Sequence, residues 1–356
     1  MPAVGLSLLL GLTGLIMASL GFPSAVEAEI FITNRGDDSV LVFADDATGD
    51  AAPLRRIAGP ATGFAGMNGI VVDTENGELF VSVQSDRVLV FDIDADGNVP
   101  PLRTIEGPNT GIDFPAGLAV DLANDELFVV NLETNSMLVF DREATGNAFP
   151  LRELGGPATG LAQPTGVFVN LEADEVFVTN EETIAAGVSV FPRAGAGNLA
   201  PLRQVMGPNT LFRVAVGLLE SPVERELSVV DLVQRSVFTF APDADGDVAP
   251  IRVATVDALV APAGMSLTVD DEFLINDLFG DALVGFPRTA SGMVAPTRFL
   301  FGPETMIEEP VYVVSTRSPY PGNVLDPVRL VPEPALGLYV ALVSALVCAG
   351  IRRSYP

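Results

Sequence analysis

The chain has 356 residues and a formal net charge of −27, with 46 acidic residues against 19 basic ones, all of them arginine. This balance excludes nucleic acid as a partner, because few cations are left to neutralise phosphates. There is no histidine and only one cysteine, so the commonest general base is missing and no internal disulfide can form. The 34 glycines and 28 prolines are typical of a chain with many tight turns.

Residues 1–28 are typical of a secretory signal peptide. Residues 4–22 carry no charge, and the small residues Val26 and Ala28 indicate cleavage near Ala28. No arginine precedes the apolar stretch, which departs from the usual pattern. A retained membrane helix is therefore the alternative, and the folded body is expected to begin at residue 29.

Six sequence repeats make up the body, and a Pro-x-Arg triplet marks them at intervals of 46 to 51 residues. A phenylalanine stands twelve residues before each arginine, and a glycine stands six residues before it. The arginines are Arg55, Arg103, Arg152, Arg203, Arg252 and Arg298. Repeats of this length are typical of β-propeller blades. We expect each arginine to form a salt bridge between blades or to a turn.

Each repeat contains four predicted strands, A to D, with the alternating apolar pattern of a half-buried sheet. In the third repeat they cover residues 115–121, 126–131, 136–141 and 150–156. No convincing helical period interrupts them. The fold class is therefore all-β.

The first repeat has B, C and D strands at residues 29–33, 40–43 and 54–58 but no A strand before them. An unpaired A strand follows the last repeat at residues 310–315. Joining this A strand to the N-terminal strands would close a ring and hide its edges. The sequence therefore predicts a six-bladed β-propeller of four-stranded antiparallel blades over residues 29–320.

The repeats resemble those of NHL-type propellers over roughly residues 29–315. The matching residues of the third repeat are Pro115, Gly117, Ala119, Val120, Asp121, Leu127, Phe128, Val129, Asn131, Val139, Phe140 and Asp141. Tyr312 departs from the pattern, because the other copies have glycine there. The resemblance implies the fold, and no activity follows from it because the family is diverse in function.

Asp92, Asp94 and Asp96 precede Gly97 at alternate positions, like the start of a calcium loop. The twelfth position, which would need a bidentate acid, is Arg103. Most equivalent turns keep the glycine and lose the acids. One interpretation is a structural connection between strands C and D, and the other is a weak Ca²⁺ site. No other cofactor is expected.

Polar side chains at the ends of the predicted B strands are the best candidates for a ligand-binding rim. They are Asn34, Ser82, Asn131, Asn180, Asp231 and Asp277. In a propeller the B–C turns and D–A loops share one face, so these side chains would surround the channel and could bind a sugar or a cation. The alternative is that each one caps its own B–C turn.

A linker at residues 321–330 leads to residues 331–356, which resemble a bacterial PEP-CTERM sorting signal. Its parts are the motif Val331, Pro332, Glu333, Pro334, the uncharged span 335–351, and the basic end Arg352, Arg353. The span is short but long enough for a membrane, and the arginines favour a cytoplasmic end. The resemblance implies cleavage near the motif by an exosortase and delivery to the cell surface or extracellular matrix. A plain membrane anchor is the alternative.

Two functions are compatible with these features. The first is a non-catalytic, exported binding or scaffold protein of the cell surface or a biofilm matrix, with exopolysaccharide or other envelope components as partners. It would touch the membrane only through its C-terminal segment, before processing. The second is a metal-dependent propeller hydrolase or lyase acting on extracellular sugars or lactones, although no strand-end glutamate completes such a metal site.

Overall fold

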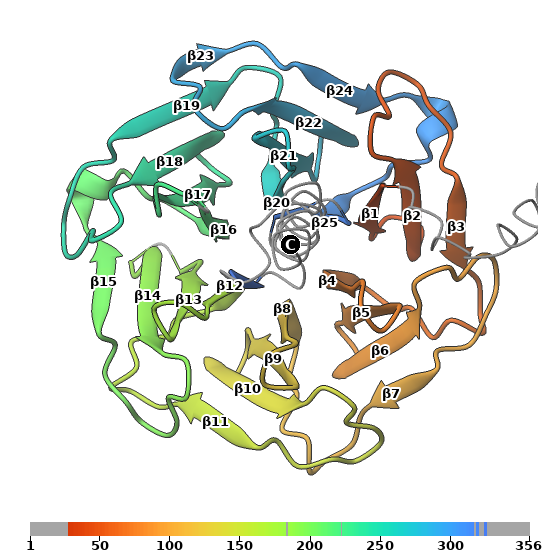
Figure 1. Ribbon diagram of the computed structural model, residues 1–356, viewed down its shortest axis with the longest axis horizontal. Helices are drawn as coiled ribbons and strands as arrows, with labels where there is room; N and C mark the ends of the chain where they lie inside the picture. Colours follow the sequence, from red (N-terminus) through yellow and green to blue (C-terminus); the bar gives the residue numbers. More distant parts are fainter. Residues whose placement is uncertain (1–27, 183, 222, 317, 320–323, 326–356) are drawn as a thin grey trace, which may run out of the picture.

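Six β-sheets surround a central channel in the computed structural model, which describes residues 28–182, 184–221, 223–316, 318–319 and 324–325 (Figure 1). The predicted six-bladed propeller of antiparallel sheets is confirmed. We number the blades 1 to 6 and keep the letters A to D for the strands from the channel outward. The predicted sorting tail, and the predicted signal peptide apart from Ala28, lie outside the described residues.

The A strands of blades 1 to 6 are β25 (Pro310–Ser315), β4 (Met67–Asp73), β8 (Pro115–Asp121), β12 (Pro164–Asn170), β16 (Ala215–Glu220) and β20 (Pro262–Leu267). The B strands are β1 (Glu29–Asn34), β5 (Glu78–Val83), β9 (Glu126–Asn131), β13 (Glu175–Asn180), β17 (Leu227–Asp231) and β21 (Glu272–Asp277). The C strands are β2 (Ser39–Ala44), β6 (Arg87–Asp92), β10 (Ser136–Asp141), β14 (Gly187–Pro192), β18 (Ser236–Phe240) and β22 (Ala282–Pro287). The D strands are β3 (Arg55–Ala58), β7 (Arg103–Ile105), β11 (Arg152–Gly155), β15 (Arg203–Met206), β19 (Arg252–Val256) and β24 (Arg298–Phe301).

Four shorter elements complete the secondary structure. Two 3₁₀ turns, η1 (Pro208–Thr210) and η2 (Pro303–Thr305), lie in D–A loops. Strand β23 (Gly292–Val294) pairs in parallel with β19, and β26 (Val324–Leu325) pairs in parallel with β12. Blades 5 and 4 therefore have five strands where four were predicted. Within the part of the chain that the structure describes, no helix is long and apolar enough to cross a membrane.

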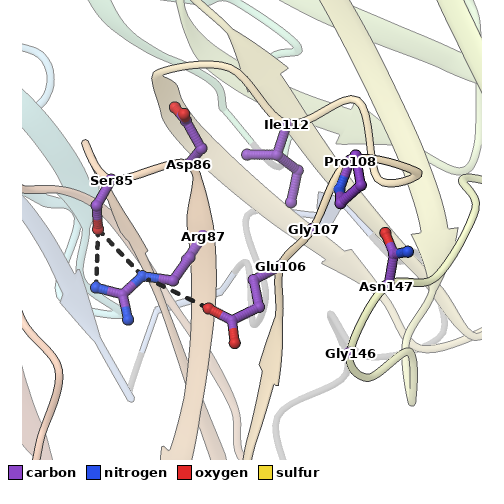
Figure 2. Close-up of a pocket in the computed structure, with 9 residues that line it drawn as sticks. All are labelled: Ser85, Asp86, Arg87, Glu106, Gly107, Pro108, Ile112, Gly146 and Asn147. Atoms are coloured by element: carbon purple, nitrogen blue, oxygen red, sulfur yellow. Dashed lines mark hydrogen bonds and ion pairs between the residues drawn. The ribbon is translucent and has the colours of Figure 1, made fainter.

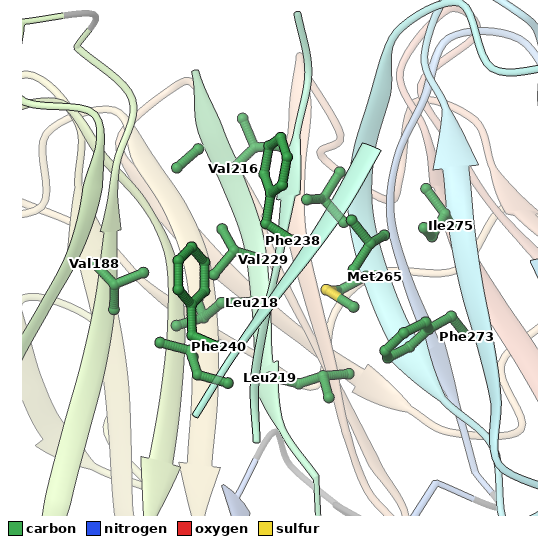
Figure 3. Packing of buried hydrophobic residues seen from close by; sticks show 14 of the residues in the cluster. Val188, Val216, Leu218, Leu219, Val229, Phe238, Phe240, Met265, Phe273 and Ile275 are labelled. Atoms are coloured by element: carbon green, nitrogen blue, oxygen red, sulfur yellow. The ribbon is translucent and has the colours of Figure 1, made fainter. Parts of the chain in front are cut away.

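The hydrophobic core fills the space between neighbouring blades. Figure 3 shows Phe238 and Phe240 of blade 5 on one side of Met265, with Phe273 and Ile275 of blade 6 on the other, all in one buried cluster. Fully burying a side chain of this size contributes about 1.5–3 kcal/mol. Because each blade buries both of its faces against neighbouring blades, opening the ring would expose buried apolar side chains to water.

Two contacts close the ring: one completes blade 1 with a strand that follows blade 6 in the chain, and the other joins blades 6 and 1 on the outside. Strand β25 pairs with β1 in the register Phe31↔Val314 and Ile32↔Val313, which confirms the predicted exchange of the A strand. On the outside, the backbone N–H of Gly49 donates to the Phe299 carbonyl at 2.8 Å, and the N–H of Phe301 donates to the Gly49 carbonyl at 2.9 Å. The connection between strands C and D of blade 1 thereby covers the outer edge of blade 6.

The same edge cover occurs at every junction and explains the repeated glycine. In blade 2, Gly97 forms a parallel bridge with Ile57 of blade 1, and four further junctions have equivalent bridges. Strand β23 covers β19 in the same way. The C–D connection is thus a structural outer layer that protects the exposed edges of the D strands. Gly97 has a φ of +73°, a conformation that glycine adopts at little cost.

The repeated arginine forms its ion pair inside its own blade, which corrects the expectation of a bridge between blades. It reaches across strand C to the glutamate near the start of strand B. The pairs are Arg55–Glu29, Arg103–Glu78, Arg152–Glu126, Arg203–Glu175, Arg252–Glu226 and Arg298–Glu272. Only a hydrogen bond to a backbone carbonyl crosses to the next blade, as from Arg103 to Arg142 at 3.0 Å.

We expect Arg203→Met to lower the free energy of unfolding by about 2–3 kcal/mol, because it leaves the half-buried Glu175 carboxylate without its cation. Replacing both partners, in Arg203→Met/Glu175→Leu, should recover much of this loss. Urea denaturation would measure both effects. The matched control is Arg56→Met, whose pair with Asp37 is more exposed and should contribute less than about 1 kcal/mol. Equal losses for the two single variants would contradict this account.

Candidate binding face around the channel mouth

The B–C turns and D–A loops lie on one face of the ring, here called the loop face. Hydrogen bonds join them in every blade, as when the N–H of Leu132 in a B–C turn donates to the carbonyl of Phe114 in a D–A loop. The A–B turns lie on the opposite face, because successive strands of each blade are antiparallel. The predicted rim residues therefore belong to the loop face.

All six predicted rim residues are buried, with exposed fractions of 2% or less. Asn131 shows what they do, because its Oδ1 accepts from the N–H of Asp113 and its Nδ2 donates to the Gly111 carbonyl at 2.8 Å. Asn34 and Asn180 likewise accept from the D–A loops of their own blades, at Glu308 and Ala162. These side chains hold the D–A loops in place and do not point freely into the channel mouth. Their role in binding a ligand stays a prediction.

Ser82 lies one residue out of register with the other five. Val83 pairs with Met67 as Asn131 pairs with Pro115, so Val83 occupies the rim position of blade 2. The Ser82 hydroxyl instead donates to the Ala116 carbonyl of the next blade at 2.6 Å. The sequence suggested Ser82 because it is the last polar side chain of its strand.

Arg87 replaces the missing amide of blade 2. It begins strand C opposite Val83, where blade 3 has Ser136 opposite Asn131. Its Nη2 donates to the Gly63 carbonyl at 2.9 Å, the bond that Asn131 makes to Gly111. The donor has moved to the neighbouring strand, a change that the strand-end pattern alone does not reveal.

Asp231 and Asp277 differ from the asparagines because they accept more bonds. The Asp231 carboxylate accepts from the N–H groups of Arg213 and Val214 in the D–A loop, and of Val233 and Gln234 in the B–C turn. In blade 3, by contrast, the N–H of Phe114 is taken by Asp86 of the preceding blade. Oδ2 of Asp231 accepts from both Arg213 and Val214, so its second bond compensates for a missing contact between blades.

The acidic C–D connection of blade 2 does not gather its carboxylates. Asp96 accepts from the N–H of Arg56 at 3.1 Å, and Asp92 accepts from the N–H of Asp94 at 2.8 Å. Nowhere in the described residues do three or more acidic or thiol side chains converge as a metal site would need. Asp92, Asp94 and Asp96 thus contribute to the edge cover, and the structure shows no cluster at the candidate Ca²⁺ site.

Tyr312 crosses the central channel. It comes from β25 of blade 1, and its hydroxyl donates to the Thr165 carbonyl of blade 4, on the opposite side of the ring, at 2.7 Å (Figure 1 shows the two strands facing each other). Burial and the nearby Glu181 carboxylate raise the pKa of this phenol, so it remains a donor. The other A strands have glycine at this position, so a single residue narrows the channel.

Burial raises the pKa of Glu181, which lies in the B–C turn of blade 4. The folded state therefore binds this proton more tightly than the unfolded chain, and the ionised form costs stability at pH values above the raised pKa. We expect Glu181→Gln to raise the melting temperature at pH 7. The gain should shrink as the pH falls through the raised pKa, which thermal melts from pH 7 to pH 4 would show. The exposed neighbour in Glu182→Gln is the control, and an equal gain there would contradict the prediction.

A cavity of about 640 Å³ opens on the loop face between blades 2 and 3 (Figure 2). Arg87 and Glu106 face each other across it at 4.0 Å, and Pro108 and Ile112 form its apolar side. The guanidinium already donates to Ser85 and Gly63, and Asn147 Oδ1 accepts from the N–H of Asn109 at 2.7 Å. Most of the polar side chains that line this cavity thus already have a partner within the protein.

The loop face of blades 5, 6 and 1 exposes an arc of apolar side chains, here called the apolar arc. Leu211, Val260 and Met306 belong to D–A loops, and Val233 and Phe279 belong to B–C turns. Their exposed fractions run from 43% for Leu211 to 64% for Phe279. In blades 1 to 3 the places of Val233 and Phe279 hold glycine, serine and glutamate. The exposed large apolar side chains of the loop face thus lie mainly in blades 5, 6 and 1, and Ile184 in the B–C turn of blade 4 is a further one.

No protein-family model and no curated protein matches the sequence. Among solved structures, a chain in the crystal structure of a nidogen/laminin complex is similar, with a TM-score of 0.61 and 12% sequence identity. The match covers 81% of this chain and 98% of that one. At this identity the similarity shows the propeller fold alone.

Proposed function

We propose that this protein is an exported, non-catalytic propeller of the bacterial cell surface or extracellular matrix, which binds or scaffolds other molecules through its loop face. The apolar arc is the observation that carries the proposal, because large exposed apolar side chains gathered on one face of a ring are typical of an interaction surface. The similar propeller in a nidogen/laminin complex supports the idea that this fold can take part in a protein assembly.

Strand β26 supports a particular orientation at the membrane. It pairs with β12 through Val169↔Val324 and Asn170↔Leu325, at the end of β12 furthest from the loop face. The two strands are parallel, so the chain at Leu325 runs away from the loop face. A membrane-bound tail would then hang from the A–B-turn side, and the loop face would point outward.

We further propose that the tail is a PEP-CTERM signal on an NHL-like propeller. An exosortase recognises the motif at residues 331–334, and envelope or matrix components such as exopolysaccharide are the partners. The sequential order of motif, apolar span and basic end supports this proposal. Until it is processed, the protein is held in the membrane by its C-terminal segment.

Replacing Glu333 and Pro334 by alanine tests the sorting proposal. We expect the variant to accumulate as a longer, membrane-bound form, because the motif that the enzyme recognises is lost. Mass spectrometry of the protein from membrane and surface fractions would measure this. Glu304→Ala, on an exposed loop of the ring, is the control and should be processed normally. Normal processing of the motif variant would contradict the proposal.

A further inference from the structure

Arg213 and Arg235 are unusual cations in this acidic chain. Among the arginines that the structure describes, only these two make no ion pair. Both are exposed on the loop face of blade 5, Arg213 in the D–A loop and Arg235 in the B–C turn. In a chain with a formal net charge of −27, these two exposed guanidinium groups of one blade are available to an acidic partner.

The ring does not need Arg235 for its own stability. Asp38, Asp86 and Asp281 occupy the same place in other blades, and each accepts an N–H from the next D–A loop. An arginine cannot accept such a bond. Asp277 takes over by accepting from the N–H of Ala261 at 2.6 Å. The Arg235 side chain therefore does not make the contact to the next D–A loop that its aspartate counterparts make.

Arg213 and Arg235 are nevertheless held close to the apolar arc. The Asp231 carboxylate binds the backbone of both loops, at Arg213 and Val214 on one side and at Val233 and Gln234 on the other. Leu211 lies two residues before Arg213, and Val233 lies two residues before Arg235. Each of the two loops thus carries one apolar and one cationic side chain, and the buried Asp231 carboxylate holds both loops in place.

Leu211 is exposed in a conformation that favours glycine. Its φ is +70°, and Gly63, Gly111 and Gly160 have the corresponding place and a similar φ in other loops. Met306 repeats this arrangement with a φ of +58°. A left-handed conformation costs free energy for a residue with a side chain, and such strain is often retained at functional sites. The folded ring alone gives no reason for a leucine here, whereas a partner that contacts it does.

We propose that Arg213, Arg235 and the adjacent apolar arc form a docking site for an acidic protein segment that carries apolar side chains. Its carboxylates would meet the two guanidinium groups, and its apolar side chains would cover Leu211 and Val233. The aliphatic part of the surface favours a protein segment over an anionic polysaccharide, whose hydroxyl groups such side chains cannot match. This inference rests on the proposed binding function and names its partner class.

Selection from a phage-displayed library of random peptides on the purified full-length protein would test the site. We expect enrichment of peptides that combine Asp or Glu with Leu, Ile, Val or Phe, and binding that weakens as salt is added. Arg213→Glu/Arg235→Glu should weaken the best peptide roughly tenfold or more. Its melting temperature should stay unchanged, because neither side chain has a bond to lose. Arg35→Glu/Arg56→Glu, with the same change of net charge, is the control and should bind normally.

Leu211→Gly provides a second measurement that separates binding from folding. It should weaken the peptide while the melting temperature does not fall, since it removes both an exposed side chain and backbone strain. Selection of basic or neutral peptides would overturn the proposal. The proposal would also be overturned if no peptide bound while polygalacturonate bound the native protein and not the arginine variant. Self-association of the chain through this patch, seen in sedimentation, would overturn it as well. Processing of the Glu333 and Pro334 variant does not depend on this patch. Failure of the docking site can therefore be told apart from failure of the proposed surface location.

Discussion

We expect a chain that ends at Glu308, and so lacks β25, to fail to form the closed ring. The deletion removes the A strand of blade 1 and leaves β1 with an unpaired edge facing the channel. It also removes the buried side chains of Val311, Val313 and Val314, each contributing about 1.5–3 kcal/mol. That loss is comparable with the whole net stability of a typical protein, about 5–15 kcal/mol. Circular dichroism melts and limited proteolysis would show the loss of the cooperative transition.

A chain that ends at Ser318 is the matched control for this deletion. It keeps β25 and the bond from the Glu29 N–H to the Thr316 hydroxyl at 2.9 Å, and it lacks only β26 and the tail. We expect it to melt cooperatively near the temperature of the full chain. If the two truncated chains melted alike, the A strand of blade 1 would not be what closes the ring.

The fold could be predicted from the sequence because its repeats impose the same contacts six times. The arginine, the phenylalanine and the glycine keep their spacing because they fill fixed places between strands B, C and D. In blade 2, for example, Arg103 pairs with Glu78 and Gly97 bridges to Ile57 of the preceding blade. The partners of these residues, however, lie on other strands, so their spacing alone did not show that the ion pair stays within one blade.

The site was less predictable, because its bonds depend on strand register and on neighbouring blades. Ser82 and Val83 are adjacent in sequence, but only the pairing with Met67 decides which of them occupies the rim position. In blade 2 the hydrogen-bond donor is Arg87 at the start of strand C, where other blades have an amide at the end of strand B. The apolar pattern of the strands does not show this change. Tyr312 stood out as a departure from glycine, yet its bond to Thr165 depends on the width of the closed ring.

Replacing the buried Asp231 by leucine is expected to lower the free energy of unfolding by about 4 kcal/mol, since four backbone N–H groups lose an acceptor at about 1 kcal/mol each. Asp231→Asn keeps one oxygen and should lose roughly half as much. Urea denaturation of both variants would measure this order. The exposed Asp257→Leu, on the next D–A loop, is the control and should change stability by less than about 0.5 kcal/mol.

The same variants separate a structural from a metal-binding role for Asp231. An ionised carboxylate offers about four lone-pair sites, and all four are occupied by the backbone of the loops that carry Arg213 and Arg235. If Asp231 were instead a metal ligand, Ca²⁺ or Mg²⁺ would raise the melting temperature of the native chain but not that of Asp231→Asn. We expect neither ion to do so. We also expect Asp231→Asn to weaken peptide docking while it remains folded, because the two arginines then lose the support that fixes their spacing.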